Sequence, residues 1–290
     1  ADFVLYHAVV DNVFTTGNMD YMHLDYWTNR SQDQYVEGAI MVPYLGSHDS
    51  SRYISRIVND GSQWNQWQEQ NLPDVPTESA YNSAKQGIAW LLTTPGAPML
   101  YMGDEFGQHG GADPDNRRML DFTLSNSQHE LLNFTSDLAE IRQNFEPLRQ
   151  GVYSTYIAES NLLAYEMSTE TESVLVVLNR GENRQFETNY DRVVYGEGTL
   201  SDSSLTISGR SVAILAMSDN IEDNSADNES IGVVDNETDL DNSNTTDNAT
   251  NQSENPQTDQ EMQFCQGCCG NTFESPVADG DCPEVSCGQC

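Results

Sequence analysis

The chain has 290 residues, of which 46 are acidic and 12 basic, and its formal net charge is −34. Such an acidic surface repels nucleic-acid phosphates and anionic membranes, so these partners are disfavoured and a neutral ligand such as a sugar is favoured. No apolar run is long enough to span a bilayer, and because the chain opens on Ala1 without a signal sequence, we expect a fragment.

The first predicted element is a helix over residues 3–14, and a βαβ unit follows it. Residues 39–46 form a short continuous apolar run, which is typical of a strand buried on both faces, although Pro43 lacks a backbone donor. A helix is predicted over 77–92 and a second buried strand over 97–102. Strand, helix and strand in this order indicate a parallel α/β sheet.

The second half of the chain changes its pattern twice. After a helix predicted over 126–145, residues 153–217 show short alternating stretches separated by Asn, Gly and Asp, which predict a small antiparallel β domain. The next stretch is rich in Asp, Asn, Ser and Thr and too poor in apolar residues to form a core, which indicates a disordered acidic linker. The expected domains are therefore 1–150, 151–217, 218–263 and a Cys-rich module over 264–290.

All six cysteines lie between Cys265 and Cys290. Their two Cys-x-x-Cys pairs have the spacing of a zinc ribbon. The even number, the small segment and the expected extracytoplasmic setting favour three disulfides instead. We expect a disulfide-bonded tail on a secreted or cell-surface protein.

Polar residues follow both predicted strands. Residues 47–49 (Ser-His-Asp) come directly after the first strand, while residues 103–105 (Gly-Asp-Glu) and the segment 110–118 follow the second. Ligands collect at the C-terminal ends of parallel strands, so these loops are the best candidates for a functional site.

In these segments the sequence resembles glycoside hydrolase family 13, the α-amylase family. Residues 44–49 resemble the signature at the end of its seventh barrel strand, although Ser47 stands where Asn is most frequent. Residues 95–105 are similar to the eighth strand, and 113–117 to the loop after it. The resemblance covers about residues 1–217. It implies an α/β fold, the C-terminal part of a (β/α)8 TIM barrel from about strand 6, followed by a small antiparallel β domain.

The resemblance also implies roles for four residues. Asp49 matches the third active-site carboxylate, which holds sugar hydroxyls at the cleavage subsite and favours an oxocarbenium-like transition state. His48 matches an imidazole that hydrogen-bonds the same sugar, and Asp113 and Arg117 match a pair that contacts the adjoining sugar. The nucleophile and the general acid lie on the fourth and fifth strands of the family's barrel, which this chain lacks.

The implied function is hydrolysis of α-glucosidic bonds in starch or maltodextrins by a retaining mechanism. We expect the isolated chain to be inactive and to need the missing N-terminal half of the same barrel. No cofactor is expected in this segment, and any calcium site is expected in the missing part. The alternatives are a glucan transferase or disaccharide isomerase of the same family, and a noncatalytic carbohydrate-binding or scaffold relative.

Structural roles compete with the functional ones. Asp49 and Arg52 could be an ion pair at the start of a helix, and Asp113 and Arg117 could pair only with each other.

Other polar and aromatic residues are ambiguous. Asp104 and Glu105 look like catalytic acids but are expected to be structural. Trp64, Trp67 and Tyr44 could stack on sugar faces, but packing in the core or in a lid is at least as strong an alternative.

Overall fold

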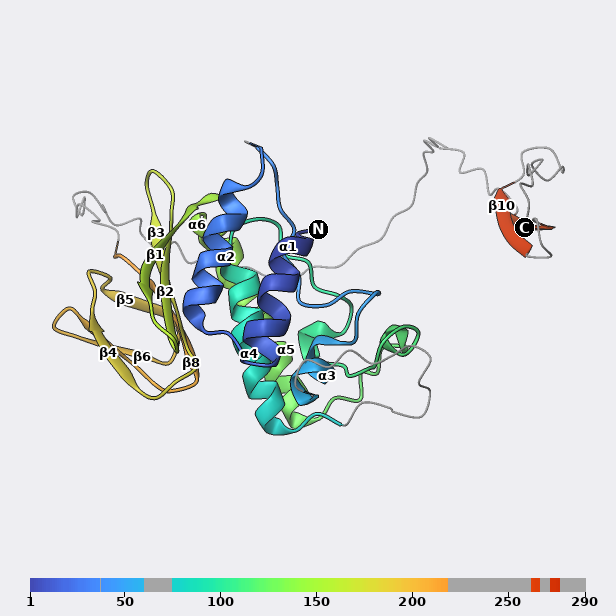
Figure 1. Ribbon diagram of the computed structural model, residues 1–290, viewed down its shortest axis with the longest axis horizontal. Coiled ribbons are helices and arrows are strands. Elements are labelled where there is room, and N and C mark those ends of the chain that lie inside the picture. Colours follow the sequence, from blue (N-terminus) through green and yellow to red (C-terminus); the bar gives the residue numbers. More distant parts are fainter. Residues whose placement is uncertain (37, 60–74, 219–261, 267–271, 277–290) are drawn as a thin grey trace, which may run out of the picture. The chain divides into compact units, whose positions relative to one another are not determined.

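The computed structural model describes residues 1–36, 38–59, 75–218, 262–266 and 272–276 (Figure 1). The chain divides into two compact units, Ala1–Ser225 and Ala226–Cys290. In the second unit, β9 (Met262–Gln266) and β10 (Thr272–Pro276) form an antiparallel pair. Nearly all of the predicted linker and all cysteine side chains lie outside the described residues, so these predictions and the domain boundaries stay predictions.

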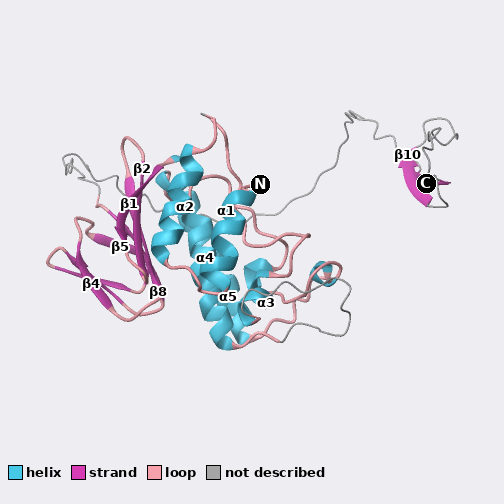
Figure 2. Ribbon diagram, viewed as in Figure 1, coloured by secondary structure: helices cyan, strands magenta, loops and turns pink. Residues whose placement is uncertain are grey.

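The N-terminal part of the first unit is helical (Figure 2). Its elements are α1 (Phe3–Leu5), η1 (Tyr6–Thr15), α2 (Tyr21–Asp33), α3 (Tyr53–Val58), α4 (Glu78–Thr93), η2 (Asp104–Phe106), η3 (Asp115–Arg117), α5 (Asn126–Asn144) and α6 (Pro147–Gln150). None of the helices in the described ranges is long and apolar enough to cross a membrane.

The two longest predicted helices are present as α4 and α5. The Thr77 hydroxyl accepts a hydrogen bond from the Ala80 amide at the start of α4, and Ser125 and Gln128 form a capping box at the start of α5. Both caps satisfy amides that have no partner within the helix, which explains why the sequence located these two starts well.

The helix predicted over 3–14 is present but differs in winding. Only α1 is α-helical, and η1 is a π-helix of 10 residues. Side chains support the wider turn, because the Asn12 amide donates to the His7 carbonyl and the Thr16 hydroxyl donates to the Asp11 carbonyl, each five residues back.

The two predicted parallel strands are extended segments rather than regular strands. They lie side by side, with one parallel bridge between Tyr44 and Met99 and hydrogen bonds from the amides of Ala97 and Met99 to the 39–46 segment. Pro43 and Pro98 have no N–H, so neither segment can donate a continuous ladder. The prediction of regular strands was therefore wrong within the described residues, while their parallel pairing was right.

The expected antiparallel sheets are present in the C-terminal part of the first unit. The strands are β1 (Val152–Ala158), β2 (Leu162–Ser168), β3 (Ser173–Asn179), β4 (Arg184–Glu187), β5 (Arg192–Gly196), β6 (Gly198–Ser201), β7 (Ser204–Ile207) and β8 (Ser211–Ala216). They form a five-stranded sheet in the order β1-β2-β3-β8-β5 and a three-stranded sheet in the order β4-β7-β6, with antiparallel pairing throughout.

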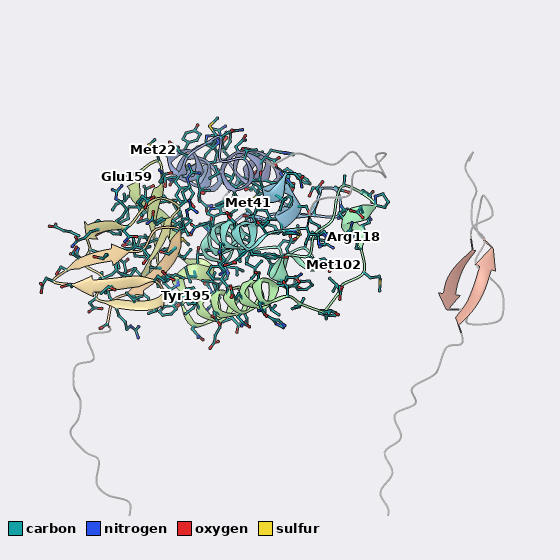
Figure 3. The ribbon with its side chains drawn as sticks, turned by 90° about the horizontal axis from the view of Figure 1, so that it is seen from below. Met22, Met41, Met102, Arg118, Glu159 and Tyr195 are labelled. Carbon is teal, nitrogen blue, oxygen red and sulfur yellow. The ribbon has the colours of Figure 1, made fainter. Side chains whose placement is uncertain are left out.

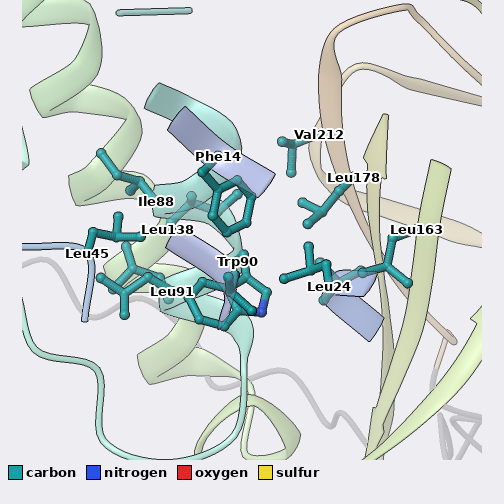
Figure 4. Close-up of a cluster of buried hydrophobic side chains, with 14 of the residues drawn as sticks. Phe14, Leu24, Leu45, Ile88, Trp90, Leu91, Leu138, Leu163, Leu178 and Val212 are labelled. Carbon is teal, nitrogen blue, oxygen red and sulfur yellow. The ribbon is translucent and has the colours of Figure 1, made fainter. Parts of the chain in front are cut away.

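The five-stranded sheet is apolar on both faces because each face has its own core. Leu163 on β2 and Leu178 on β3 pack toward the helices, in one cluster with Leu24 and Trp90 (Figure 4). Leu162, the neighbour of Leu163 on β2, points to a second cluster shared with the three-stranded sheet. The cluster on the helical side anchors the helices on the sheet.

Candidate functional site

The two candidate loops, residues 47–52 and 110–118, lie against each other. The Arg52 amide donates to the Gly110 carbonyl at 3.0 Å, and the Gly110 amide donates to the Ser55 hydroxyl at 2.9 Å. Met102 and Arg118 mark this region in Figure 3, at the end of the helical part that is remote from the β strands of the first unit. The site therefore lies far from the β domain and depends on the loops for its shape.

All four residues predicted from the sequence gather at this contact. His48 Nε2 lies 3.3 Å from Asp49 Oδ1, and the two side chains are 60% and 72% exposed. Arg117 Nε lies 2.8 Å from Asp113 Oδ1, and its Nη2 lies 3.9 Å from Asp49 Oδ1. Arg117 thus connects the carboxylate of one loop with that of the other, and the alternative that it pairs only with Asp113 does not hold.

The exposed group is suited to binding a polyhydroxyl ligand. The carboxylates of Asp49 and Asp113 accept hydrogen bonds, Arg117 donates them, and the His48 imidazole can do both in its neutral form. Exposed ion pairs of this kind contribute little to stability, about 0–1 kcal/mol, so their side chains can exchange partners with a ligand at small cost.

Beneath the exposed group lies a buried pair of charges, Arg52 and Asp104. Their closest atoms, Arg52 Nη1 and Asp104 Oδ1, are 4.0 Å apart, and both side chains are buried. Arg52 Nη1 donates to the Met102 carbonyl, and the guanidinium carbon lies 4.4 Å from the centre of the Tyr101 ring. Arg52 therefore interacts with the second loop and its strand, and the structural alternative of an Arg52–Asp49 ion pair is not found within the described residues.

The burial of Asp104 changes its ionisation. Loss of solvent raises the pKa of the Asp104 carboxyl to about 7, and the charge of Arg52 opposes this rise. Oδ2 of Asp104 has no hydrogen-bond partner within the described residues, and it would lie 3.0 Å from a Cβ atom built on Gly46. The glycine lets the first loop pass closely over this carboxyl. The neighbouring Glu105 makes a local hydrogen bond, in which its Oε2 accepts from the Gly103 amide at 2.7 Å.

Of the three aromatic candidates, the structure describes only Tyr44. Tyr44 is buried and stacks on Tyr6 with ring centroids 4.4 Å apart, so it belongs to the core, and of its two alternatives packing is confirmed rather than sugar stacking. Trp64 and Trp67 lie outside the described residues. No group of three or more His, Cys, Asp or Glu side chains that could hold a metal ion occurs in the part of the chain that the structure describes.

The sequence interpretation missed Asn116, which is fully buried between the two loops. Its amide nitrogen contacts three carbonyl oxygens of the first loop. The signal available in the sequence was its place in the motif between Asp113 and Arg117, but the partners of a buried amide cannot be seen from spacing alone.

Known proteins are similar to this chain in sequence and in fold. The β/α-amylase of Paenibacillus polymyxa is 24% identical over 220 residues, which are 73% of this chain and 17% of the relative. Neopullulanase 2 of Thermoactinomyces vulgaris is 28% identical over 187 residues, or 62% of this chain and 28% of the relative. The α-amylase of Geobacillus thermoleovorans, solved in complex with acarbose, superposes with a TM-score of 0.61 at 18% identity. The match covers 76% of this chain and 48% of the amylase chain.

The chain spans between 17% and 28% of the length of the first curated relatives. No family model matches it. The relatives as a class are amylases, cyclomaltodextrinases and neopullulanases, which are enzymes that act on α-glucans. The resemblance to glycoside hydrolase family 13 is thereby confirmed, and the matches are consistent with this chain being a part of a family 13 enzyme.

Proposed function

We propose that this chain is the C-terminal part of an enzyme that hydrolyses α-glucosidic bonds of starch or maltodextrins with retention of configuration. Residues 1–150 then correspond to the last part of a (β/α)8 barrel, and residues 151–217 to the β domain that follows it. The observation that supports the proposal best is the convergence of Asp49, His48, Asp113 and Arg117 on one exposed surface.

Each side chain has a role that fits its chemistry. The Asp49 carboxylate accepts hydrogen bonds from hydroxyls of the sugar at the cleavage point, and its negative charge favours the positive charge that develops on the sugar ring. His48 binds the same sugar, while Asp113 and Arg117 hold the adjoining one. Because a retaining hydrolase also needs a nucleophile and a general acid, which the resemblance assigns to preceding strands, the isolated chain is inactive.

Further parts of the proposal concern the setting of the enzyme. It acts outside the cell or at the cell surface, where disulfides in the cysteine-rich tail persist. Its substrate is a neutral α-glucan or oligosaccharide, which the negative net charge of the chain does not repel. None of these roles needs a cofactor bound by residues 1–290.

The test uses the complete gene product that contains these residues. Hydrolysis of soluble starch is measured for the natural protein and for Asp49→Asn, which keeps the size of the side chain and removes its charge. A loss of kcat of at least about 1,000-fold with an unchanged circular dichroism spectrum is expected, in line with the loss of one strong transition-state contact. Full activity in Asp49→Asn, or no activity in the natural protein, would refute the proposal.

A further inference from the structure

In addition to the backbone hydrogen bond between Arg52 and Gly110, the buried side chain of Asn116 joins the two loops of the candidate site. Its Nδ2 lies 2.8 Å from the carbonyl oxygens of both His48 and Ser50, and 3.4 Å from that of Ser47. Carbonyl oxygens can only accept hydrogen bonds, so three of them around one atom require the amide nitrogen at this position. Asn116 is therefore a donor directed at the backbone of the His48-Asp49 loop.

The position of Asn116 in the chain makes this contact a link between the two halves of the site. It lies in η3, between Asp113 and Arg117, whose side chains form the other half. The start of η3 is itself fixed, because Asp115 accepts hydrogen bonds from the Gly111 amide at 2.6 Å and from Arg118 at 2.7 Å. Through Asn116, η3 is therefore hydrogen-bonded to the carbonyl groups beside Asp49.

The site residues themselves do not provide an equally firm link. Across the loops, the Arg117–Asp49 contact is exposed and 3.9 Å long, whereas the amide of Asn116 is buried and makes two contacts of 2.8 Å. A buried hydrogen bond is costly to break, because the group left behind stays unsolvated. The register of the two loops is thus fixed by Asn116 more than by the charged residues.

We propose that Asn116 is a positioning residue, which holds the His48-Asp49 loop in register with Asp113 and Arg117 so that both halves bind neighbouring sugars of one α-glucan chain. The inference rests on the proposed function of the site. It assigns no chemical step to Asn116 and predicts that its removal misaligns the two halves.

Two substitutions separate the amide's donor role from its volume. Asn116→Asp keeps the shape and places carboxylate oxygens against three carbonyl oxygens, and Asn116→Ser shortens the side chain so that it no longer reaches the loop. Asn133→Asp, at an exposed position of α5, is the matched control for the added charge. In the complete gene product we expect kcat/KM on maltooligosaccharides to fall about 10- to 100-fold for Asn116→Ser, further for Asn116→Asp, and not at all for Asn133→Asp.

A double-mutant cycle with Arg117→Ala distinguishes positioning from a general loss of stability. If Asn116 keeps Arg117 in register with Asp49, Arg117→Ala costs less in the Asn116→Ser background than in the natural protein. Strictly additive losses of kcat/KM, or unchanged kcat/KM in both Asn116 variants, would overturn the inference.

Amide hydrogen exchange tests the link without any need for activity. We expect Asn116→Ser to accelerate exchange in a peptide covering residues 45–52 and to leave a peptide from α5 unchanged. Unchanged exchange over 45–52, or equal acceleration in both peptides, would contradict a specific link between the loops. A natural protein without α-glucan hydrolysis would refute the proposed function alone, because the exchange experiment still decides whether Asn116 holds the loop.

Discussion

The β domain and the candidate site of the first unit are stabilised in different ways. The β domain has two apolar clusters on opposite faces of one sheet, and its backbone groups pair in regular antiparallel ladders. The candidate loops have little regular structure, and they depend on buried polar side chains, Arg52, Asp104 and Asn116, that contact backbone or each other. A binding site needs exposed charged side chains in a fixed arrangement. In this structure the buried polar side chains that hold the loops lie beneath the exposed charged ones.

The largest effect is expected when Arg52 is replaced. Arg52→Ala leaves the Asp104 carboxyl buried without its cation, and we expect the free energy of unfolding of the complete gene product to fall by about 3–5 kcal/mol. Urea denaturation measures this loss. The matched control is Arg192→Ala at an exposed position on β5, with a change within about 0.5 kcal/mol. Equal effects of the two substitutions would show that the buried pair does not support the loops.

A substitution in the β domain sharpens the contrast between stability and activity. Leu175 on β3 is fully buried in the cluster between the two sheets, so Leu175→Ala leaves a cavity and is expected to cost about 2–5 kcal/mol. Because the site is remote from this cluster, kcat of the folded protein should stay unchanged at a temperature well below unfolding. A reduced kcat in the fully folded variant would mean that the β domain shapes the site.

A smaller, pH-dependent effect is expected from Asp104. The pKa of its carboxyl is about 7 in the folded chain and 3.8 as the ordinary value, so the folded state keeps this proton as the pH rises while the unfolded state releases it. The contribution of Asp104 to stability is therefore lost as the pH rises from about 4 to about 7. The pH-dependent contributions of the other acidic groups to the free energy of unfolding cancel when the natural protein is compared with Asp104→Asn.

The difference in free energy of unfolding, natural protein minus Asp104→Asn, should thus decrease between about pH 4 and about pH 7. A difference that stays constant over this range would show that Asp104 ionises normally, and one that increases would show that Arg52 dominates its environment.

The sequence predicted what depends on local pattern. Helices α4 and α5 were predicted from their sequence pattern, and in the structure Thr77 and Ser125 cap them. The β domain was predicted because its strands alternate between short turns. The residues Asp49 and Arg117 were found through a motif, and the structure brings them together. Local pattern was sufficient in each of these cases because the deciding contacts are close in sequence or belong to a known family signature.

The sequence did not predict what depends on distant contacts. The sequence offered an ion pair with the nearby Asp49 as an alternative role for Arg52, yet Arg52 packs over Tyr101 and beside Asp104, because burial favours the ring and the carboxyl that lie beneath the loop. Asn116 was overlooked because the three carbonyl groups it contacts lie more than 60 residues away. Buried polar side chains are matched to partners by tertiary structure, which spacing along the chain does not reveal.

The most direct test of the central claim is a crystal structure of the complete gene product with acarbose, the compound bound by the Geobacillus thermoleovorans α-amylase. The account predicts hydroxyl oxygens of one sugar unit within about 2.6–3.2 Å of the Asp49 carboxylate and the His48 imidazole, and the neighbouring unit against Asp113 and Arg117. Acarbose bound elsewhere, with these four side chains still exposed to solvent, would contradict the assignment of this surface as the substrate site.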